Sequence, residues 1–424
     1  MIWLLLLVIV VLIFLRVPIF LSLLAVSVFY IMLEPTAGTV IVQRMSSGLE
    51  SFPLLAVPLF ILAGTLMARG GIAERLMDFA TVLVGHWRGG LAQVNVLNSF
   101  MMGGMSGSSN ADAAVDAKVL VPIMRKQGYP NGFASAITAA SGSIAPILPP
   151  SIGLILYGVL ANVSIGALFI GGVIPGVLIA VALTAMVAIL SRRRGYPKVR
   201  DKFATFPEIA RSFWRSLPAL LMPVLLIVGL RIGVFTPTEL AAIAVIYALI
   251  VSFALKQITL RELPGILRES VFTSAVVMII IAGAAVFGII VAYEQIPKQL
   301  LGLITGISEN PYVILLIINV LLLILGVFME SSSLMIILVP VLAPVAASVG
   351  IDPVHFGLII VLNLTIGSMT PPVGSVLYTV AAITKVKIMD FTKAFLPMFF
   401  TLVLVLLLIT YIPGLVTWLP ELTR

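Results

Sequence analysis

The stretch PPSIGLILY at residues 149–157 returns in the second half of the chain as PPVGSVLY at residues 371–378. Earlier in each half, the sequence ILAG at 61–64 matches IIAG at 280–283, and the turn sequence GYP at 128–130 matches GIDP at 350–353. Matches that keep one order and a similar offset are typical of an internal repeat. The sequence therefore predicts two related halves, residues 1–215 and 216–424.

Composition places both halves in a lipid bilayer. Of the 424 residues, 61% are hydrophobic and 10% are charged, and the mean hydropathy is +1.22. Such a chain is far too apolar for a water-soluble fold. Runs of about 20 apolar residues, the length of a membrane-spanning helix, recur along it. The first run, residues 1–15, has neither a basic start nor a cleavage pattern, so we expect a retained span.

Charge and rare residue types exclude several functions. The formal net charge is +8, but the basic residues lie in short loops between apolar runs, which disfavours nucleic-acid binding. The chain has no cysteine and two histidines, which argues against disulfides, thiolate nucleophiles and metalloenzyme chemistry. We therefore expect no enzyme activity and no cofactor.

Each half reads as one series of elements: scaffold spans, an amphipathic arm, a Gly/Ser-rich reentrant hairpin, a Pro-broken span and a closing span. Because a reentrant hairpin returns to its own side, each half crosses the membrane about five times, and this odd number predicts inverted repeats. In the first half we predict scaffold spans at 1–69, an arm at 70–88, a hairpin at 89–127, a broken span at 130–162, a closing span at 166–190 and a basic cytoplasmic loop at 191–215. In the second half we predict scaffold spans at 217–291, an arm at 292–309, a hairpin at 311–349, a broken span at 353–384 and a closing span at 394–419.

The basic loop sets the expected orientation. It begins with Arg192-Arg193-Arg194 and continues to Lys202, and such loops usually face the cytoplasm. The first hairpin then opens from the cytoplasmic side and the second from the external side.

The hairpins carry residues that break helices at membrane depth. The first contains GGMSGSSNAD at 103–112 and the second GVFMESSS at 326–333. Backbone carbonyls freed in lipid would cost several kcal/mol each, so these segments must line a cavity or bind a ligand. The broken spans offer similar groups at 141–150 and 363–372. Carbonyl and hydroxyl oxygens suit a hard alkali cation, which predicts two symmetric cation sites.

The sequence resembles the large membrane subunit of the tripartite ATP-independent periplasmic (TRAP) transporters along essentially its whole length. The residues that carry the resemblance are SFPLLAVPLF at 51–60, Gly104 to Asp112, PPS at 149–151, IPG at 174–176 and TPP at 370–372. The resemblance implies an elevator mechanism, sodium coupling and a bacterial inner-membrane location. It also implies two partners, a small four-helix-type membrane subunit on a separate chain and a periplasmic substrate-binding protein.

The resemblance also implies where ligands bind, largely through backbone atoms. Its first sodium site falls on Ser106, Ser109, Gly142, Ala145 and Ile147. Its second falls on Gly326, Gly367, Thr370 and Val373, to which we add Glu330 and Ser332 from the second tip. For the substrate we name Ser108, Asn110, Asp112, Ser331, Asn363 and Tyr157.

Several of these residues allow two interpretations. Asp112 and Asp116 lie one helical turn apart and would repel each other unless a cation or hydrogen bonds intervene. Glu330 suits either a cation site or a helix cap. Tyr157 suits substrate contact or packing. Lys118 suits a substrate carboxylate, an ion pair with Asp116 or an aliphatic stem that reaches toward water.

The sequence thus predicts a sodium-coupled importer of an organic anion such as sialic acid, a dicarboxylate, a sugar acid or a sulfonate. An alternative is a two-component anion carrier, coupled to sodium or protons, that needs no binding protein. An intramembrane protease that uses Asp112 and Asp116 is a weaker alternative, because such a dyad needs two facing helices.

Overall fold

The structure is a computed structural model that describes residues 8–9, 11–12, 15, 17–33, 43, 49–232, 234–306 and 308–422. Within these ranges all regular structure is helical, and eight helices are long and apolar enough to cross a membrane. The chain is therefore an all-α polytopic membrane protein, as predicted. Most of the predicted first span, residues 1–15, lies outside the described residues.

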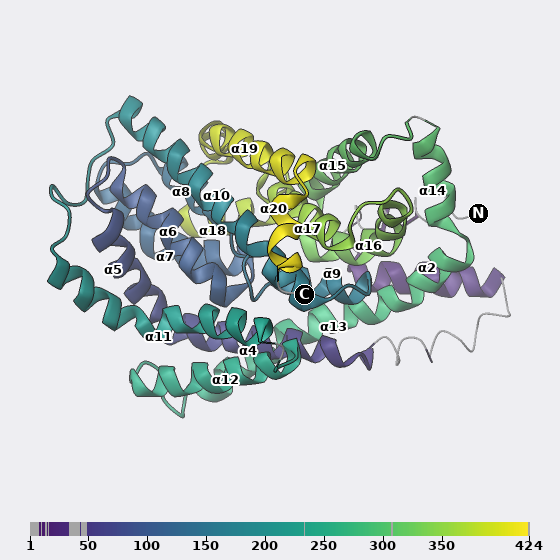
Figure 1. Ribbon diagram of the computed structural model, residues 1–424, viewed down its shortest axis with the longest axis horizontal. Helices are drawn as coiled ribbons and strands as arrows, with labels where there is room; N and C mark the ends of the chain where they lie inside the picture. Colours follow the sequence, from purple (N-terminus) through teal and green to yellow (C-terminus); the bar gives the residue numbers. More distant parts are fainter. Residues whose placement is uncertain are drawn as a thin grey trace.

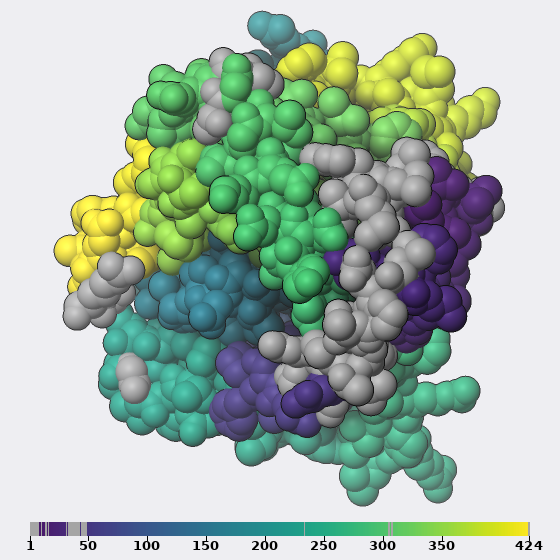
Figure 2. Space-filling model, turned by 90° about the vertical axis from the view of Figure 1, so that its right-hand side faces the viewer, coloured from purple at the N-terminus to yellow at the C-terminus, as the bar shows by residue number. Residues whose placement is uncertain are grey.

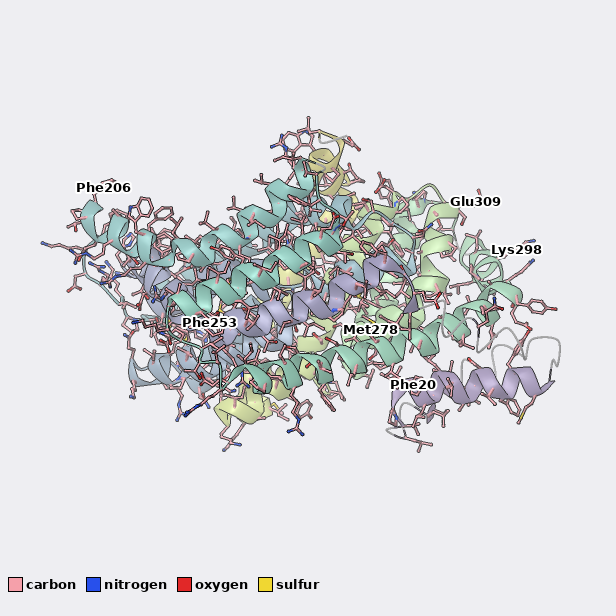
Figure 3. All side chains as sticks on the ribbon, turned by 90° about the horizontal axis from the view of Figure 1, so that it is seen from below. Phe20, Phe206, Phe253, Met278, Lys298 and Glu309 are labelled. Atoms are coloured by element: carbon pink, nitrogen blue, oxygen red, sulfur yellow. The ribbon has the colours of Figure 1, made fainter. Side chains whose placement is uncertain are left out.

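One layer of helices forms the scaffold. Seen from below, α11, α12, α4 and α13 run side by side, and α2 lies next to α13 (Figure 3). The short 3-10 helix η2 (Phe52–Leu55) leads into α4. The bounds of the scaffold helices are Ile19–Leu33 for α2, Ala56–Arg69 for α4, Phe206–Arg231 for α11, Pro237–Ala254 for α12 and Leu263–Tyr293 for α13.

The other helices form a body above this layer (Figure 1). It contains two helical hairpins, two broken helix pairs and the closing helices. The hairpins are α6 (Gly90–Ser106) with α7 (Ser109–Lys126), and α15 (Pro311–Phe328) with α16 (Ser331–Ser348). The broken pairs are α8 (Asn131–Ser141) with α9 (Ile152–Leu160), and α17 (Pro353–Met369) with α18 (Ser375–Thr384). The closing helices are α10 (Ile165–Arg194), α19 (Ile388–Tyr411) and α20 (Gly414–Glu421).

Two shorter helices connect the layers. The first arm, α5 (Ile72–Val84), packs against α6 and α11, and the second arm, α14 (Ile296–Thr305), packs against α13 and α16. Figure 2 shows α14 in mid-green across the end of the molecule, beside the lighter green of α16. Each arm thus joins a scaffold helix to a hairpin.

Both broken pairs are interrupted at the repeated Pro-Pro motif. The Pro149–Pro150 and Pro371–Pro372 peptide bonds are both cis. Proline lacks the amide donor that a helix needs, so neither pair continues as one helix. The side chain of Ser151 then caps α9 by accepting a hydrogen bond from the Leu154 amide at 3.0 Å.

Two boundaries differ from the predicted ones. Helix α10 continues through Arg194 before Gly195 ends it in a left-handed conformation with φ of +69°, and α11 begins at Phe206. The predicted loop at 191–215 is therefore helical at both ends. At its first end the arginines extend α10, because basic residues are favourable in the last turn of a helix. The closing span predicted at 394–419 begins earlier and is two helices, α19 and α20, with Pro413 between them.

Candidate functional site

A cavity of about 880 Å³ lies where the two hairpin tips meet the scaffold. The first tip contributes Gly107 to Asn110, and the second contributes Glu330 to Ser333. The α17 side chains Val361 and Thr365 also line it. The opposite wall comes from the scaffold helices and is almost entirely apolar; it includes Phe20 and Leu21 of α2 and Val276, Val277, Ile279 and Ile280 of α13.

The first tip is a tight turn between α6 and α7. Gly107 has a φ of +59°, a left-handed conformation that favours glycine. A β-carbon at this position would also lie 2.3 Å from the Pro150 carbonyl oxygen. Ser108 follows and caps α7 by accepting a long hydrogen bond, 3.5 Å, from the Ala111 amide. The tip is thereby seated against the cis-proline turn of the first broken pair.

Part of the predicted first sodium site lies together at this contact. A β-carbon on Gly142 would lie 3.2 Å from the Ser109 carbonyl oxygen, and one on Gly103 would lie 3.0 Å from the Ala145 α-carbon. Ser106 adds a buried hydroxyl with no hydrogen-bond partner among the described residues. The Ile147 carbonyl oxygen faces Gly172 of α10. An oxygen-rich contact with an unpartnered hydroxyl fits an alkali cation.

A buried polar network lies behind the first tip. Asp116 accepts hydrogen bonds from the Asn98 side-chain amide at 2.7 Å and from the Ser99 hydroxyl at 3.1 Å. Asp112 is fully buried, and neither of its carboxylate oxygens has a hydrogen-bond partner in the described part of the chain. Hydrogen bonds thus stabilise Asp116, whereas Asp112 presents oxygen atoms that a cation or proton would satisfy.

The second tip is organised by Glu330. Its carboxylate caps α16, accepting from the Ser333 amide at 3.0 Å and from the Ser332 hydroxyl at 3.0 Å. The neighbouring Ser331 hydroxyl donates to the Leu364 carbonyl oxygen of α17 at 3.0 Å. Glu330 therefore acts as a helix cap in this structure, and it also lines the cavity.

The predicted second sodium site is partly assembled behind this tip. Gly326 of α15 and Gly367 of α17 touch, since a β-carbon on Gly367 would lie 2.6 Å from the Gly326 α-carbon. Thr370 ends α17 and donates its hydroxyl proton to the Ile366 carbonyl oxygen at 2.8 Å. Val373 is 47% exposed in the turn that follows.

The substrate residues named from the sequence divide into two groups. Ser108, Asn110 and Ser331 line the central cavity. Asp112, Asn363 and Tyr157 are fully buried and do not line it. Asn363 donates to the Asn319 side chain at 2.8 Å, and the Tyr157 hydroxyl donates to the Pro353 carbonyl oxygen at 2.8 Å.

The scaffold wall of the cavity has no distinctive pattern in the sequence. Phe20 and Val276 sit in long apolar helices whose residues look the same whether they face lipid or a cavity. Met335 and Ile336 of α16 were missed for the same reason. Thr273 lines the cavity, but the hydroxyl groups of Ser270 and Ser274 in the same helix do not, so hydroxyl-bearing residues did not mark this wall in the sequence.

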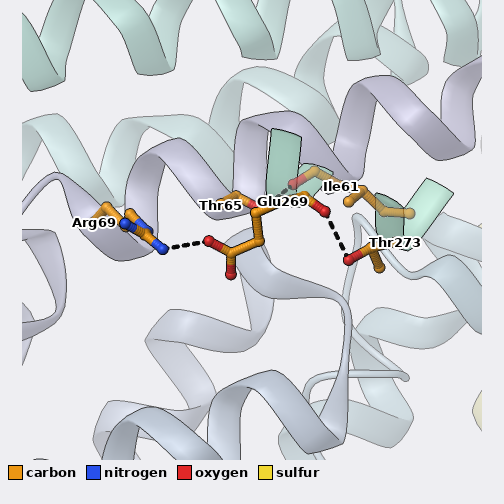
Figure 4. A network of polar contacts seen from close by, with 5 residues as sticks. All are labelled: Ile61, Thr65, Arg69, Glu269 and Thr273. Atoms are coloured by element: carbon orange, nitrogen blue, oxygen red, sulfur yellow. Dashed lines mark hydrogen bonds and ion pairs between the residues drawn. The ribbon is translucent and has the colours of Figure 1, made fainter. Parts of the chain in front are cut away.

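A second cavity of about 660 Å³ adjoins the first and shares Ile61, Ser108, Ile152 and Thr273 with it. Its wall carries charges, including Lys118 of α7. Arg69 of α4 forms a close ion pair with Glu269 of α13, whose carbonyl oxygen accepts from the Thr273 hydroxyl at 3.0 Å (Figure 4). Met102 of α6 and Ala111, Ala114 and Val115 of α7 also line this second cavity, which therefore lies along the first hairpin.

Comparison with known proteins places the chain in a family. The model for the DctM component of the tripartite ATP-independent periplasmic transporters matches residues 6–415. The chain belongs to this family. TRAP large permeases are therefore its relatives, and the family's name describes a transporter of three components, not an enzyme.

Individual TRAP permeases align over most of the chain. The sialic acid large permease SiaM of Vibrio cholerae is 44% identical over 97% of this chain and 96% of its own. The C4-dicarboxylate large permease DctM of Rhodobacter capsulatus is 38% identical and covers 89% of both chains. The isethionate permease DctMQ of Oleidesulfovibrio alaskensis is 38% identical over 88% of this chain and 59% of its own.

Solved structures of more distant proteins share the fold. The YdaH transporter of Alcanivorax borkumensis superposes with a TM-score of 0.66 at 16% identity, covering 90% of this chain and 88% of its own. MtrF of Neisseria gonorrhoeae gives 0.61 at 15% identity, covering 89% and 85%. At these identities the likeness concerns the fold alone.

Proposed function

We propose that this chain is the substrate-translocating subunit of a sodium-coupled importer of small organic anions. The observation that carries this proposal is the charge of the central cavity. Among its described wall residues there is no lysine, arginine or histidine, and the one ionisable side chain is Glu330. An anion held there needs positive charge from elsewhere.

Two sources of positive potential are available at the cavity. The N-termini of α7 and α16, at Ser109 and Ser331, both lie on its wall, and helix N-termini favour anions. Sodium ions bound behind the two tips, at the oxygen-rich contacts described above, would supply full charges. Two sodium ions with one monoanion would move one net charge, worth about 2.3 kcal/mol per 100 mV.

The contact between the scaffold layer and the body that holds the hairpins supports an elevator mechanism. No hydrogen bond between two described residues joins a scaffold helix (α2, α4, α11, α12 or α13) to either hairpin or broken pair. The closing helices are tied to that body, because Asn319 donates to Thr410 at 2.9 Å and Gln93 donates to the Thr184 carbonyl oxygen at 3.0 Å. Between the described residues, the layers are thus not joined by a hydrogen bond, which favours the sliding of one rigid body on another. The arms α5 and α14 would bend as it moves.

Inverted repeats follow from the same proposal. Each half supplies one hairpin, one broken pair and one arm in the same order, and their tips meet at one cavity. An inverted arrangement would place the first hairpin on the cytoplasmic side and the second outside. The second cavity, with Arg69 and Lys118, would then form the cytoplasmic release path for an anion.

Relatives suggest the substrate class and partners. The permeases described above are named for sialic acid, C4-dicarboxylates and isethionate, all of them organic acids. We propose an acid of this kind, delivered by a periplasmic binding protein to a complex of this chain with a separate small subunit in the bacterial inner membrane. The coupling ion would be sodium, with no other cofactor.

Uptake into proteoliposomes tests the proposal. The chain is reconstituted with its small subunit, and labelled sialic acid or a C4-dicarboxylate is supplied on its binding protein. Accumulation with an inward sodium gradient, and none with potassium or without the binding protein, is expected. Uptake that does not require the binding protein would favour the two-component carrier. Uptake driven by a proton gradient alone would show that sodium is not the coupling ion.

A further inference from the structure

A third cavity, of about 760 Å³, lies away from the transport site, between the arm α5 and the first turns of α11. Its wall is rich in arginine. Arg75 comes from α5, Arg200 from the connection before α11, and Arg211 and Arg215 from α11 itself. The only carboxylates on this wall are Asp78 and Glu208. The pocket thus carries an excess of positive charge.

Most of these arginines have no acidic partner. Glu208 pairs with Arg200 at 2.8 Å. The other ion pair within the described residues is Arg69 with Glu269, which lies elsewhere. Arg211 and Arg215 are exposed and form no ion pair there, and Arg75 is half-buried and donates only to the Arg215 carbonyl oxygen at 3.4 Å. Guanidinium groups left free along one wall are suited to bind a phosphate group through paired hydrogen bonds.

The pocket has a fixed frame. The Ser216 hydroxyl donates to the Arg75 carbonyl oxygen at 2.8 Å, and the rings of Phe79 and Phe213 pack with centroids 6.0 Å apart. These contacts join α5 to α11 beneath the arginines. The charged side chains therefore project from a packed crossing of two helices.

Aromatic side chains place this pocket at the membrane surface. Phe206, labelled at one end of the scaffold in Figure 3, is 82% exposed, and Trp214 is 68% exposed. Exposed tryptophan in the first turns of a membrane helix is typical of the lipid headgroup region. The basic run Arg192-Arg193-Arg194 ends α10, and a short connection leads from it to the start of α11. Because basic residues at helix ends usually face the cytoplasm, we expect the pocket to lie at the cytoplasmic leaflet.

We infer that this pocket binds the phosphate headgroup of an anionic phospholipid from the cytoplasmic leaflet. Basic pockets between membrane helices on this side recognise such headgroups. The site bridges α5 and α11, which belong to the arm and the scaffold respectively, so a bound lipid holds the arm at its cytoplasmic end. Free phosphate has the same chemistry but lacks the acyl chains that would cover Phe206 and Trp214.

Native mass spectrometry of the purified full-length chain tests this inference. The protein is titrated with phosphatidylglycerol and with phosphatidylcholine of the same acyl chains. We expect preferential binding of phosphatidylglycerol, and an affinity reduced about thirtyfold in the double variant R211Q/R215Q, since each basic residue near the surface contributes about one kcal/mol. The matched control R261Q/R268Q removes two exposed arginines outside the pocket and should bind like the parent.

Three results would overturn the inference. They are equal binding of the two lipids by the parent protein, an equal loss of phosphatidylglycerol binding in both double variants, or inorganic phosphate binding as tightly as phosphatidylglycerol in the absence of lipid. Unfolding temperatures measured for both variants distinguish a lost site from a lost fold, because a lost site leaves the temperature unchanged in phosphatidylcholine.

Discussion

Gly326 and Gly367 allow α15 and α17 to cross with their backbones in contact. A β-carbon on Gly367 would lie 2.6 Å from one backbone carbon of Gly326 and 2.8 Å from the next. We expect Gly367→Ala to lower the free energy of unfolding by about 1–3 kcal/mol, the usual cost of overpacking. Because the crossing lies behind the second tip, sodium-driven uptake should fall as well. Thermal unfolding and uptake in proteoliposomes measure the two effects.

Gly288 of α13 provides the matched control. A β-carbon there would meet no atom within 4 Å. Gly288→Ala should therefore leave uptake intact and stabilise the helix by about 0.5–1 kcal/mol. Equal losses in the two variants would mean that the close crossing has no special role.

A substitution at Glu330 distinguishes the two roles that the sequence allows for this residue, a ligand of a cation and a helix cap. Glu330→Gln keeps an oxygen that can accept from the Ser333 amide, so the cap and the protein's stability should persist. The variant removes the one described negative charge on the cavity wall. We expect the sodium concentration for half-maximal uptake to rise about tenfold, in keeping with the strength of interactions with charged groups. An unchanged sodium dependence would leave Glu330 as a cap alone.

At this scale the sequence could locate the tips but not every contact. Ser108, Asn110 and Ser331 were predicted because they lie in the hydroxyl-rich segments that interrupt the apolar helices, and they line the cavity. Asn363 was named because a polar side chain in an apolar span needs a polar neighbour, and that neighbour is Asn319 on another helix. A partner 44 residues away leaves no local signal in the sequence.

Among the elements, α13 begins from a turn that Glu262 holds together. Its carboxylate accepts from the Thr259 amide and hydroxyl, both at 2.8 Å. These bonds, with a smaller contribution from Arg69, lower the pKa of Glu262 below its usual value. A lowered pKa stabilises the turn above the ordinary pKa of glutamate, and this stabilisation is lost as the pH falls through the lowered value, below about pH 4.

Glu262→Ala should therefore loosen the start of α13 at neutral pH. Hydrogen exchange followed by mass spectrometry is expected to quicken in the peptide that covers residues 256–265 and nowhere else. Glu421→Ala, a change at an exposed carboxylate of α20, is the control. Faster exchange across the whole protein would show global destabilisation instead.

The boundaries of the helices could be predicted where the local sequence strongly favours a turn. The Gly/Ser-rich segments lie at the turns between α6 and α7 and between α15 and α16, because glycine and capping serines favour chain reversal over helix. The end of α10 had a weaker signal. The three consecutive arginines at 192–194 were predicted to begin a loop, but they extend α10 as far as Gly195. Such a run is polar, but arginine is a good helix former.

On the scale of the whole molecule, the sequence predicted scaffold spans, arms, hairpins and broken spans. It did not predict which scaffold residues line the cavity. The scaffold was expected to be separate from the hairpins, but which of its residues face them depends on packing between helices remote in sequence. Gly64 of α4 illustrates this. A β-carbon there would lie 3.2 Å from the Met105 carbonyl oxygen of α6 and 3.6 Å from the Ser106 α-carbon.

This contact gives a direct test of sliding between the layers. The chain has no cysteine, so a single engineered pair, Gly64→Cys with Ser106→Cys, carries the only thiols. With a Gly64 β-carbon 3.6 Å from the Ser106 α-carbon, the two side chains are close enough for a disulfide bond to form. If the body moves against the scaffold during transport, oxidation should abolish uptake and a reductant should restore it. Each single variant measures the cost of its own substitution. Uptake that persists in the fully cross-linked protein would require a mechanism in which the first hairpin stays fixed to α4, and the elevator proposal would then fail.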